Sequence, residues 1–243
     1  MPKTTEPDSR GEHSLVWSKR RSVLAVGAHP DDIEIGCGGT LLAHKAAGDQ
    51  VVMLVLTDGA QGPGLHAATR KAEQMEAARR LGVELRWAGA ADGELVDGHE
   101  TIRVIEDVIG EIGADVVYTH YPRDSHQDHR ATAKAAISAA RHVPQVLHFE
   151  SPSSLDFEPR LFVDVGPHVE AKLHALAAHG SQTAGSRQVD PDIIHAQMRV
   201  HGFAAKAHFA EAFYARRFLI GLEVVADPAL GADFGRLPQS STL

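Results

Sequence analysis

Short apolar runs alternate with segments of helical periodicity through the middle of the chain. The apolar runs, bounded by turn residues, predict buried strands over 22–27, 51–57, 83–87, 115–120, 145–149 and 161–164. The periodic segments between and after them predict helices over 39–47, 67–81, 101–112, 129–141, 167–179 and 191–218. Strands that are separated by crossover helices predict an α/β fold built on a parallel sheet.

The two ends of the chain lack this alternation. Residues 1–20 are polar and contain no apolar signal core, and residues 226–243 are rich in Gly, Pro and Ser. We expect flexible tails at 1–20 and 226–243 around a single α/β domain at 21–225. No apolar run reaches the roughly 20 residues of a spanning helix, so we expect no membrane span and no secretion.

Charge and cysteine content narrow the class of protein further. The 24 basic and 32 acidic residues give a net charge of -8 and form no dense basic cluster, so we expect no nucleic-acid partner. The single cysteine, Cys37, excludes an internal disulfide framework and favours a cytoplasmic location. The sequence is compatible with a homo-oligomer.

Two loops at predicted strand ends hold most of the candidate chemistry, and ligands of parallel sheets bind at such ends. The first loop, Ala28-His29-Pro30-Asp31-Asp32, directly follows the first strand. Imidazole and carboxylate are both zinc ligands, and one tight turn would bring His29 and Asp32 onto the same cation. By itself, this loop would equally suit a turn in which Asp32 caps the next helix.

The second loop, His126-Gln127-Asp128-His129-Arg130, follows the fourth strand after a short spacer. If a helix begins here, His126 and His129 lie three residues apart on one face. One of them could then bind a metal while the other faces a substrate. By itself, this loop would equally suit a solvated start of a helix.

Together the two loops predict a catalytic metal centre. They are far apart in the chain, yet both lie at strand ends that a parallel sheet brings together. A catalytic zinc has three protein ligands and one open position. His29, Asp32 and His129 would supply those three ligands.

The remaining polar residues of the two loops would then serve the reaction. Asp31 lies beside the predicted ligands and could deprotonate a bound water, whose pKa zinc lowers to about 7. His126 could stabilise the tetrahedral intermediate or protonate the departing amine. Asp128 could hold His126 in the required tautomer and raise its pKa.

These motifs resemble those of the PIG-L/LmbE-like family of zinc-dependent N-acetylglucosaminyl deacetylases. The family's AHPDD segment stands at 28–32, followed by Gly36 and Gly-Gly-Thr, and its HxDH segment stands at 126–129. Further matches are Thr57-Asp58-Gly59, Arg70 with Glu73, a His-x-Ser-Gln segment at 179–182 and Glu211-Ala212-Phe213. The resemblance extends from about residue 23 to 218, which is most of the chain.

The resemblance implies a Rossmann-like three-layer fold with a mostly parallel sheet flanked by helices. It implies one zinc ion per chain, with iron(II) as the alternative metal, and the same ligands and base as above. It adds Arg70 as a substrate contact. The implied substrate is an N-acetyl amino sugar or its conjugate, which would yield acetate and a free amine.

Some features outside the two motifs carry expectations of their own. Some members of the family have a tyrosine two residues before the first histidine of the second motif, where this chain has Asp124. The glycines at 36–39 lack the spacing of a phosphate loop, so we expect them to permit close packing. We expect His120 to pack or orient other groups, and segments 58–65 and 151–158 to shape the substrate pocket. His179 could line that pocket.

Three alternatives remain at this stage. The nearest is an amidase that acts on a thiol-sugar conjugate or another N-acyl substrate. The second is a non-haem iron oxygenase, whose metal is also held by two histidines and one carboxylate, although the parallel sheet argues against it. The third is a non-catalytic sugar-binding protein, which would not need a base beside the metal such as Asp31.

Overall fold

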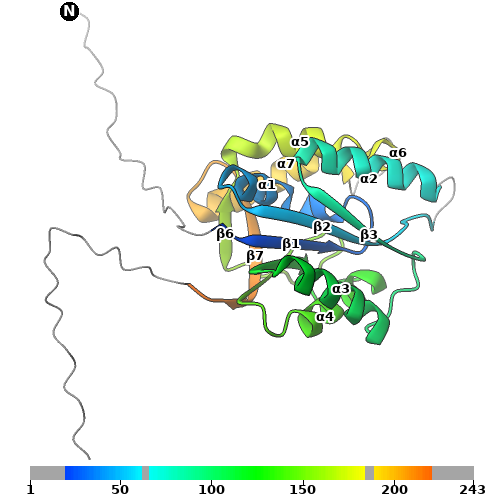
Figure 1. The fold of residues 1–243 in the computed structure, drawn as a ribbon. Helices are drawn as coiled ribbons and strands as arrows, with labels where there is room; N and C mark the ends of the chain where they lie inside the picture. The colour runs from blue at the N-terminus through cyan, green and yellow to red at the C-terminus, as the bar shows by residue number, and fades with distance from the viewer. Residues whose placement is uncertain (1–19, 62–65, 184–188, 221–243) are drawn as a thin grey trace, which may run out of the picture.

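The computed structural model describes residues 20–61, 66–183 and 189–220 of the 243-residue chain. The tails predicted at 1–20 and 226–243 lie outside these ranges, apart from Arg20, and remain predictions. Within the described ranges the elements surround a single sheet (Figure 1). None of the helices there combines the length and the hydropathy that crossing a bilayer requires.

Seven strands form this sheet in the order β3-β2-β1-β4-β5-β7-β6. The strands are β1 (Ser22–Gly27), β2 (Gln50–Thr57), β3 (Glu84–Ala90), β4 (Val116–His120), β5 (Gln145–Phe149), β6 (Leu161–Asp164) and β7 (Ala210–Phe218). The first five strands pair in parallel, whereas β7 runs antiparallel to both β5 and β6. The predicted α/β fold with a mostly parallel sheet is therefore confirmed.

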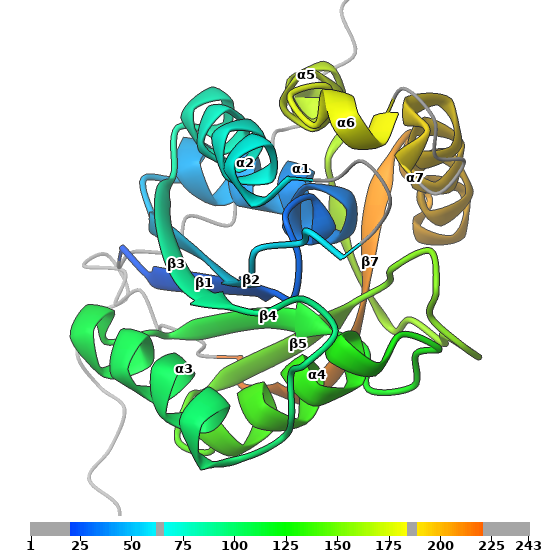
Figure 2. The ribbon, with the colours of Figure 1, turned by 90° about the vertical axis from the view of Figure 1, so that its right-hand side faces the viewer.

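Helices cover both faces of the sheet. They are α1 (Asp32–Ala46), α2 (Ala67–Leu81), α3 (His99–Ile112), α4 (Gln127–Ala139), α5 (Val169–Leu176), α6 (Gly180–Thr183), α7 (Pro191–Ala205) and the short 3₁₀ turn η1 (Gly166–His168). Figure 2 shows α3 and α4 on one side and the other α-helices on the opposite side, which makes three layers. Two apolar clusters fill the spaces between these layers.

Each apolar cluster takes alternate residues of the central strands. On β1, Val23 and Ala25 belong to the cluster under α1 and α2, while Leu24 and Val26 belong to the cluster over α3 and α4. Because successive side chains of a strand point to opposite faces, a strand covered on both sides must be apolar at every position. This double burial explains the uninterrupted apolar runs in the sequence.

The strand order reverses between β1 and β4. The chain proceeds from β1 to β2 and β3 on one side, and then resumes at β4 and β5 on the other side. The loops that leave β1 and β4 therefore diverge and leave a crevice at their carboxyl ends, where parallel sheets bind ligands. Residues 28–31 and 121–126 are these two loops. The fold thus brings the two predicted motifs to one place.

The helix predicted over 191–218 is wrong in its second half. Helix α7 ends at Ala205, where Lys206 adopts a left-handed conformation (φ 63°), and β7 begins at Ala210. No Gly or Pro marks this stop in the sequence, which is why periodicity alone extends the helix. The first residues of β7 are buried by pairing with β5 and β6, and that long-range pairing decides their conformation.

Helix α1 starts earlier than predicted and includes the glycines at 36–39. Cys37 departs from helical angles (φ -148°, ψ 16°), so the helix is kinked there. A Cβ atom at Gly36 would lie 2.2 Å from the ring of Phe149. The expectation that these glycines permit close packing is confirmed, because any side chain at position 36 would displace that aromatic ring.

A buried ion pair stabilises the kinked helix from the side of β7. The carboxylate of Glu211 accepts hydrogen bonds from the backbone N–H groups of Gly39 (2.8 Å) and Thr40 (2.7 Å), the first free donors after the kink. Its Oε1 also accepts from Lys172 Nζ at 2.6 Å, and that ammonium donates to the carbonyl of Ile35. Glu211 therefore caps the second half of α1 and neutralises a buried lysine.

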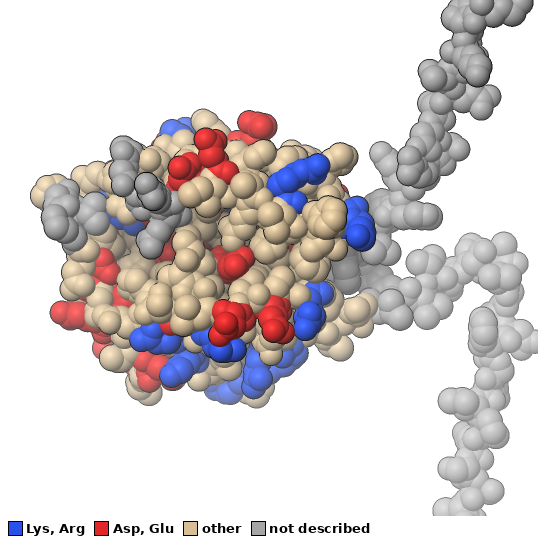
Figure 3. Space-filling model, turned by 180° about the vertical axis from the view of Figure 1, so that it is seen from behind, with Lys and Arg blue, Asp and Glu red and all other residues tan. Residues whose placement is uncertain are grey.

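Acidic and basic side chains are mixed over the face of the molecule seen in Figure 3. Lysine and arginine side chains are most frequent along the lower edge of that view.

We predict that Glu211→Ala destabilises the protein by about 3–5 kcal/mol, because it leaves the Lys172 ammonium buried without its partner. Urea unfolding measures this change. Glu76→Ala serves as the control, since Glu76 pairs with Arg79 and Arg80 on the surface, and we expect it to unfold at nearly the wild-type urea concentration. Equal midpoints for Glu211→Ala and the wild type would contradict the role of the buried pair.

Candidate active site

One cavity at the switch point contains six of the seven residues predicted from the sequence. It has a volume of about 440 Å³. The six are His29, Asp31, Asp32, Arg70, His126 and His129. The seventh, Asp128, lies fully buried behind the cavity wall. Segments 58–65 and 151–158 contribute Gly59, Gln61, Pro152 and Ser153 to the lining, as expected.

A second and larger hollow does not compete with this site. It has a volume of about 700 Å³ and lies beside the end of α7, between Arg199, Phe203 and His208. None of the predicted residues lines it, and its only carboxylate among the described residues is Asp164. The smaller cavity is the candidate active site, because the carboxylates and imidazoles converge there.

The three predicted ligands lie at the spacing of a tetrahedral metal site. His29 Nδ1 is 3.3 Å from Asp32 Oδ2 and 3.3 Å from His129 Nε2. His129 Nε2 is 3.4 Å from Asp32 Oδ1. Atoms bonded to a tetrahedral zinc at about 2.0–2.1 Å are separated from each other by about 3.3–3.4 Å. The two imidazoles approach different oxygens of Asp32, so this spacing suits a cation that lies between both rings and that carboxylate.

The other ring nitrogen of each histidine faces a carboxylate. His129 Nδ1 is 3.1 Å from Asp124 Oδ2. His29 Nε2 is 3.2 Å from Asp128 Oδ2 and 3.0 Å from Asp92 Oδ1. Histidines that bind metals have this arrangement, because a carboxylate that accepts one ring N–H leaves the lone pair of the second nitrogen for the metal.

The electrostatics of this cluster favour added positive charge. Burial lowers the pKa of His129, but the carboxylates of Asp32 and Asp124 outweigh that effect and raise it to about 9. The pKa of His29 is also raised despite burial, through Asp128, Asp32 and Asp92. A site that draws protons onto two buried imidazoles would also attract a cation that replaces those protons. Three groups of side chains could hold a metal ion, and they overlap at His29 and His129: His29 with His126 and His129, Asp32 with His120 and His129, and His29 with Asp92 and Asp128.

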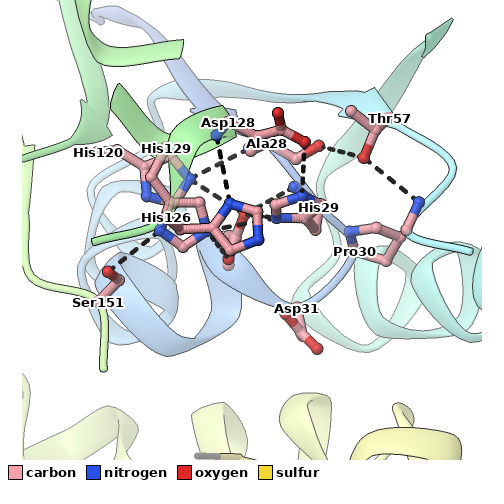
Figure 4. Close-up of polar contacts among 12 residues, drawn as sticks. Ala28, His29, Pro30, Asp31, Thr57, His120, His126, Asp128, His129 and Ser151 are labelled. Atoms are coloured by element: carbon pink, nitrogen blue, oxygen red, sulfur yellow. Dashed lines mark hydrogen bonds and ion pairs between the residues drawn. The ribbon is translucent and has the colours of Figure 1, made fainter. Parts of the chain in front are cut away.

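Asp31 lies to one side of the four imidazoles labelled in Figure 4, and no contact joins it to any of them there. Burial raises its pKa to about 6, although the guanidinium of Arg70 opposes the shift. Arg70 Nη2 donates to Asp31 Oδ2 at 3.2 Å. Asp31 also has a left-handed backbone (φ 96°), which typically costs about 1–3 kcal/mol for a residue other than glycine.

Arg70 contacts the turn of the first motif as well as the cavity. Its guanidinium donates to the carbonyls of Pro30 and Gly59 in addition to Asp31. Only Nη1 has no hydrogen-bond partner among the described residues. The arginine therefore holds two loops together, while its buried Nη1 lies 3.9 Å from Glu73 Oε2.

His126 adopts a defined tautomer through the backbone of Asp128 and not through its carboxylate. The Asp128 N–H donates to His126 Nδ1 at 3.3 Å. Since Nδ1 is then an acceptor, the neutral ring carries its proton on Nε2. Burial and the charges of His29 and His129 lower the pKa of His126, which favours that neutral form. As predicted, the charge of the Asp128 carboxylate raises the pKa of His126, although the other effects outweigh it. The predicted control of the tautomer by this carboxylate differs from the structure, where it faces His29.

Sequence reasoning misses two of the orienting carboxylates. It marks Asp124 only as a departure from the family, and it does not single out Asp92. A signal for Asp92 exists, because it lies in the loop after β3, whose carboxyl end faces the site. His120 Nε2 lies 3.0 Å from Asp32 Oδ2, in agreement with its expected orienting role. His179 does not line the cavity and is fully buried.

Known proteins share both the sequence motifs and the fold. The family model PIG-L, described as GlcNAc-PI de-N-acetylase, matches residues 24–140. The uncharacterized deacetylase YaiS of Escherichia coli is 38% identical over 176 residues, which cover 68% of this chain and 93% of that protein. Diacetylchitobiose deacetylase of Thermococcus kodakarensis is 30% identical, with coverage of 67% and 70% respectively.

Among solved structures, the conserved protein TT1542 from Thermus thermophilus has a TM-score of 0.75 and is 28% identical. The match covers 83% of this chain and 97% of that one. The family match at residues 24–140 includes both motif loops. The match to YaiS is 38% identical and covers 93% of that protein, and the family model also matches this chain. This chain therefore belongs to the PIG-L family of de-N-acetylases, which are hydrolases of amide bonds.

Proposed function

We propose that this chain is a zinc-dependent hydrolase that removes the acetyl group from the nitrogen of an amino sugar or amino-sugar conjugate. The observation that carries the proposal is the close approach of His29 Nδ1, His129 Nε2 and the two oxygens of Asp32, at 3.3–3.4 Å from one side chain to the next, beside the separate carboxylate of Asp31. The deacetylase that acts on diacetylchitobiose supports the choice of substrate class. The buried, unpaired Cys37 supports a cytoplasmic location.

His29, Asp32 and His129 would hold the metal. A bound zinc ion supplies a lowered pKa for water and polarises the acetyl carbonyl. Two histidines and one carboxylate also suit iron(II). We prefer zinc because the distances match a tetrahedral site and because amide hydrolysis needs no redox change.

Asp31 is proposed as the general base. Its Oδ2 is occupied by Arg70, so Oδ1 is the oxygen that accepts a proton from the attacking water. Water adds to the acetyl carbon, and the same carboxyl group then protonates the sugar nitrogen as the carbon–nitrogen bond breaks. The products are acetate and a free amine. A group that accepts and then returns one proton needs a pKa near the working pH.

His126 is proposed to stabilise the tetrahedral intermediate. Its proton lies on Nε2 when its ring is neutral, because Nδ1 accepts from the backbone N–H of Asp128. That Nε2–H can donate to the oxygen of the former carbonyl, which gains negative charge as water adds. The carboxylate of Asp128 contributes indirectly, through its contact with the ring of His29.

The proposed activity is tested by acetate release from a panel of N-acetyl amino sugars and their conjugates. We expect chelation to abolish release from at least one substrate and added zinc to restore it. A panel with N-acyl groups other than acetyl separates deacetylation from a broader amidase. Zinc-loaded protein that releases acetate from none of these substrates would contradict the proposal and favour the amidase alternative.

We predict that Asp31→Asn lowers kcat by about 10²–10⁴-fold, the usual contribution of a general base. The zinc content should stay at the wild-type value, because Asp31 contacts none of the three donor atoms. Steady-state kinetics and metal analysis measure the two quantities on the same preparation. Turnover near the wild-type rate with zinc bound would show that another group is the base.

We predict that Asp124→Ala weakens zinc binding by about 10–100-fold, because His129 loses the carboxylate that orients its ring. Competition with a chromophoric chelator measures the affinity. Asp49→Ala is the matched control, since Asp49 makes the same kind of contact with His44 Nδ1 (2.7 Å) at a place outside the cavity. Equal zinc affinity for the two variants would refute the orienting role.

A further inference from the structure

Two residues of α2 hold the turn that carries Asp31. Arg70 and Gln74 lie four residues apart and therefore project from one face of the helix. Arg70 donates to the carbonyl of Pro30 and to the carboxylate of Asp31. Gln74 Oε1 accepts a hydrogen bond from the backbone N–H of Asp31 at 3.1 Å. The side chain and the backbone of Asp31 are thus each held by a different residue of the same helix.

The backbone of Asp31 needs such support because its conformation is uncommon. Its angles are φ 96° and ψ -27°, in the left-handed region that residues with a Cβ atom rarely adopt. Such conformations persist only where surrounding contacts enforce them. The conformation also decides where the carboxyl group points, since a change in φ would rotate the side chain about the peptide backbone.

The orientation of the Gln74 amide is fixed by a buried carboxylate. Gln74 Nε2 donates to Glu34 Oε1 at 2.7 Å. A carboxylate only accepts hydrogen bonds, so the NH₂ group must face Glu34 and the oxygen must face the N–H of Asp31. His179 Nε2 lies 3.7 Å from the same Glu34 oxygen, a contact longer than a hydrogen bond.

None of the three residues can contact a substrate directly. Glu34, Gln74 and His179 are fully buried, and none of them lines the cavity. The three side chains form one row, in which the Gln74 amide is hydrogen-bonded on both sides. Glu34 Oε2 and both ring nitrogens of His179 have no hydrogen-bond partner among the described residues. The row ends at the backbone of Asp31, and its remaining members lie behind that residue.

We infer that Gln74 is a positioning residue for the reaction, which holds Asp31 in its left-handed conformation and is itself oriented by Glu34 and His179. The expected effect on turnover rests on the proposed function, in which Asp31 is the base. The expected effect on the backbone conformation of Asp31 is independent of the proposed function. His179, the first residue of the His-x-Ser-Gln segment, thereby gains a role behind the site, whereas Gln182 of the same segment lines the cavity.

The first test is Gln74→Met, which keeps the length of the side chain and removes both hydrogen bonds. We expect kcat to fall by about 10–100-fold, the scale of a displacement of about 1 Å at a reacting group. KM and zinc content should stay within about twofold, because the substrate contacts and the metal ligands are untouched. A crystal structure of the variant should show Asp31 at negative φ.

Gln145→Met is the matched control for the substitution itself. Gln145 is buried, and its side-chain amide donates to the carbonyl of Leu219 at 2.9 Å, away from the cavity. We expect this variant to keep the wild-type kcat and the left-handed Asp31. Loss of activity in Gln74→Met and not in Gln145→Met separates the position from the general effect of replacing a buried glutamine.

A reciprocal exchange separates positioning from general loss of stability. Gln74→Glu places two carboxylates side by side and should reduce kcat at least as much as Gln74→Met. In the double variant Glu34→Gln/Gln74→Glu, the new amide at position 34 donates a hydrogen bond to the new carboxylate at position 74. That carboxylate still accepts a hydrogen bond from the backbone N–H of Asp31. We expect it to recover most of kcat and the positive φ of Asp31.

Two results would overturn the inference: Asp31 at positive φ in the Gln74→Met crystal structure, or a kcat of that variant within about twofold of wild type. A double variant that folds but recovers neither kcat nor the positive φ would also overturn it. If the wild-type protein releases no acetate from any substrate, the proposed function fails. The φ of Asp31 in the variants then still decides whether Gln74 sets the conformation.

Discussion

The architecture of the site depends on the pairing of two imidazoles with buried carboxylates. Asp124 contacts Nδ1 of His129, and Asp128 and Asp92 both contact Nε2 of His29. Each ring is thereby turned so that its other nitrogen faces Asp32. Without these contacts the rings could rotate, and the three donor atoms would not be held at a common spacing. In the proposed site, the orientation of the ligands would therefore depend on carboxylates that do not bind the cation.

The sheet brings these groups together because its strand order reverses between β1 and β4. Residues of the two motif loops can then meet although they are far apart in the chain. The antiparallel strand β7 adds a second constraint, since Glu211 on that strand caps the kinked helix α1 that follows the first loop. The part of the chain nearest the proposed metal ligands is therefore anchored from both the sheet and the helical layer.

The sequence predicted the convergence of the motifs but not their finer orientation. Apolar runs and strand ends were enough to bring His29 and His129 together, because the rule for parallel sheets does not depend on side-chain detail. The direction of the Asp128 carboxylate and the role of Asp92 depend on rotamers and on the path of the loop after β3, which no periodicity encodes. The strand β7 was missed for a related reason, since its pairing partners lie elsewhere in the chain.

The central claim is that His29, Asp32 and His129 bind one metal ion through His29 Nδ1, an oxygen of Asp32 and His129 Nε2. Anomalous diffraction at the zinc edge, recorded from crystals of the zinc-loaded protein, tests this claim most directly. We predict one peak within bonding distance of all three atoms, with Asp124 and Asp128 outside that distance. A peak bound instead through His29 Nε2 with Asp92 and Asp128, or no peak in the cavity, would contradict the account.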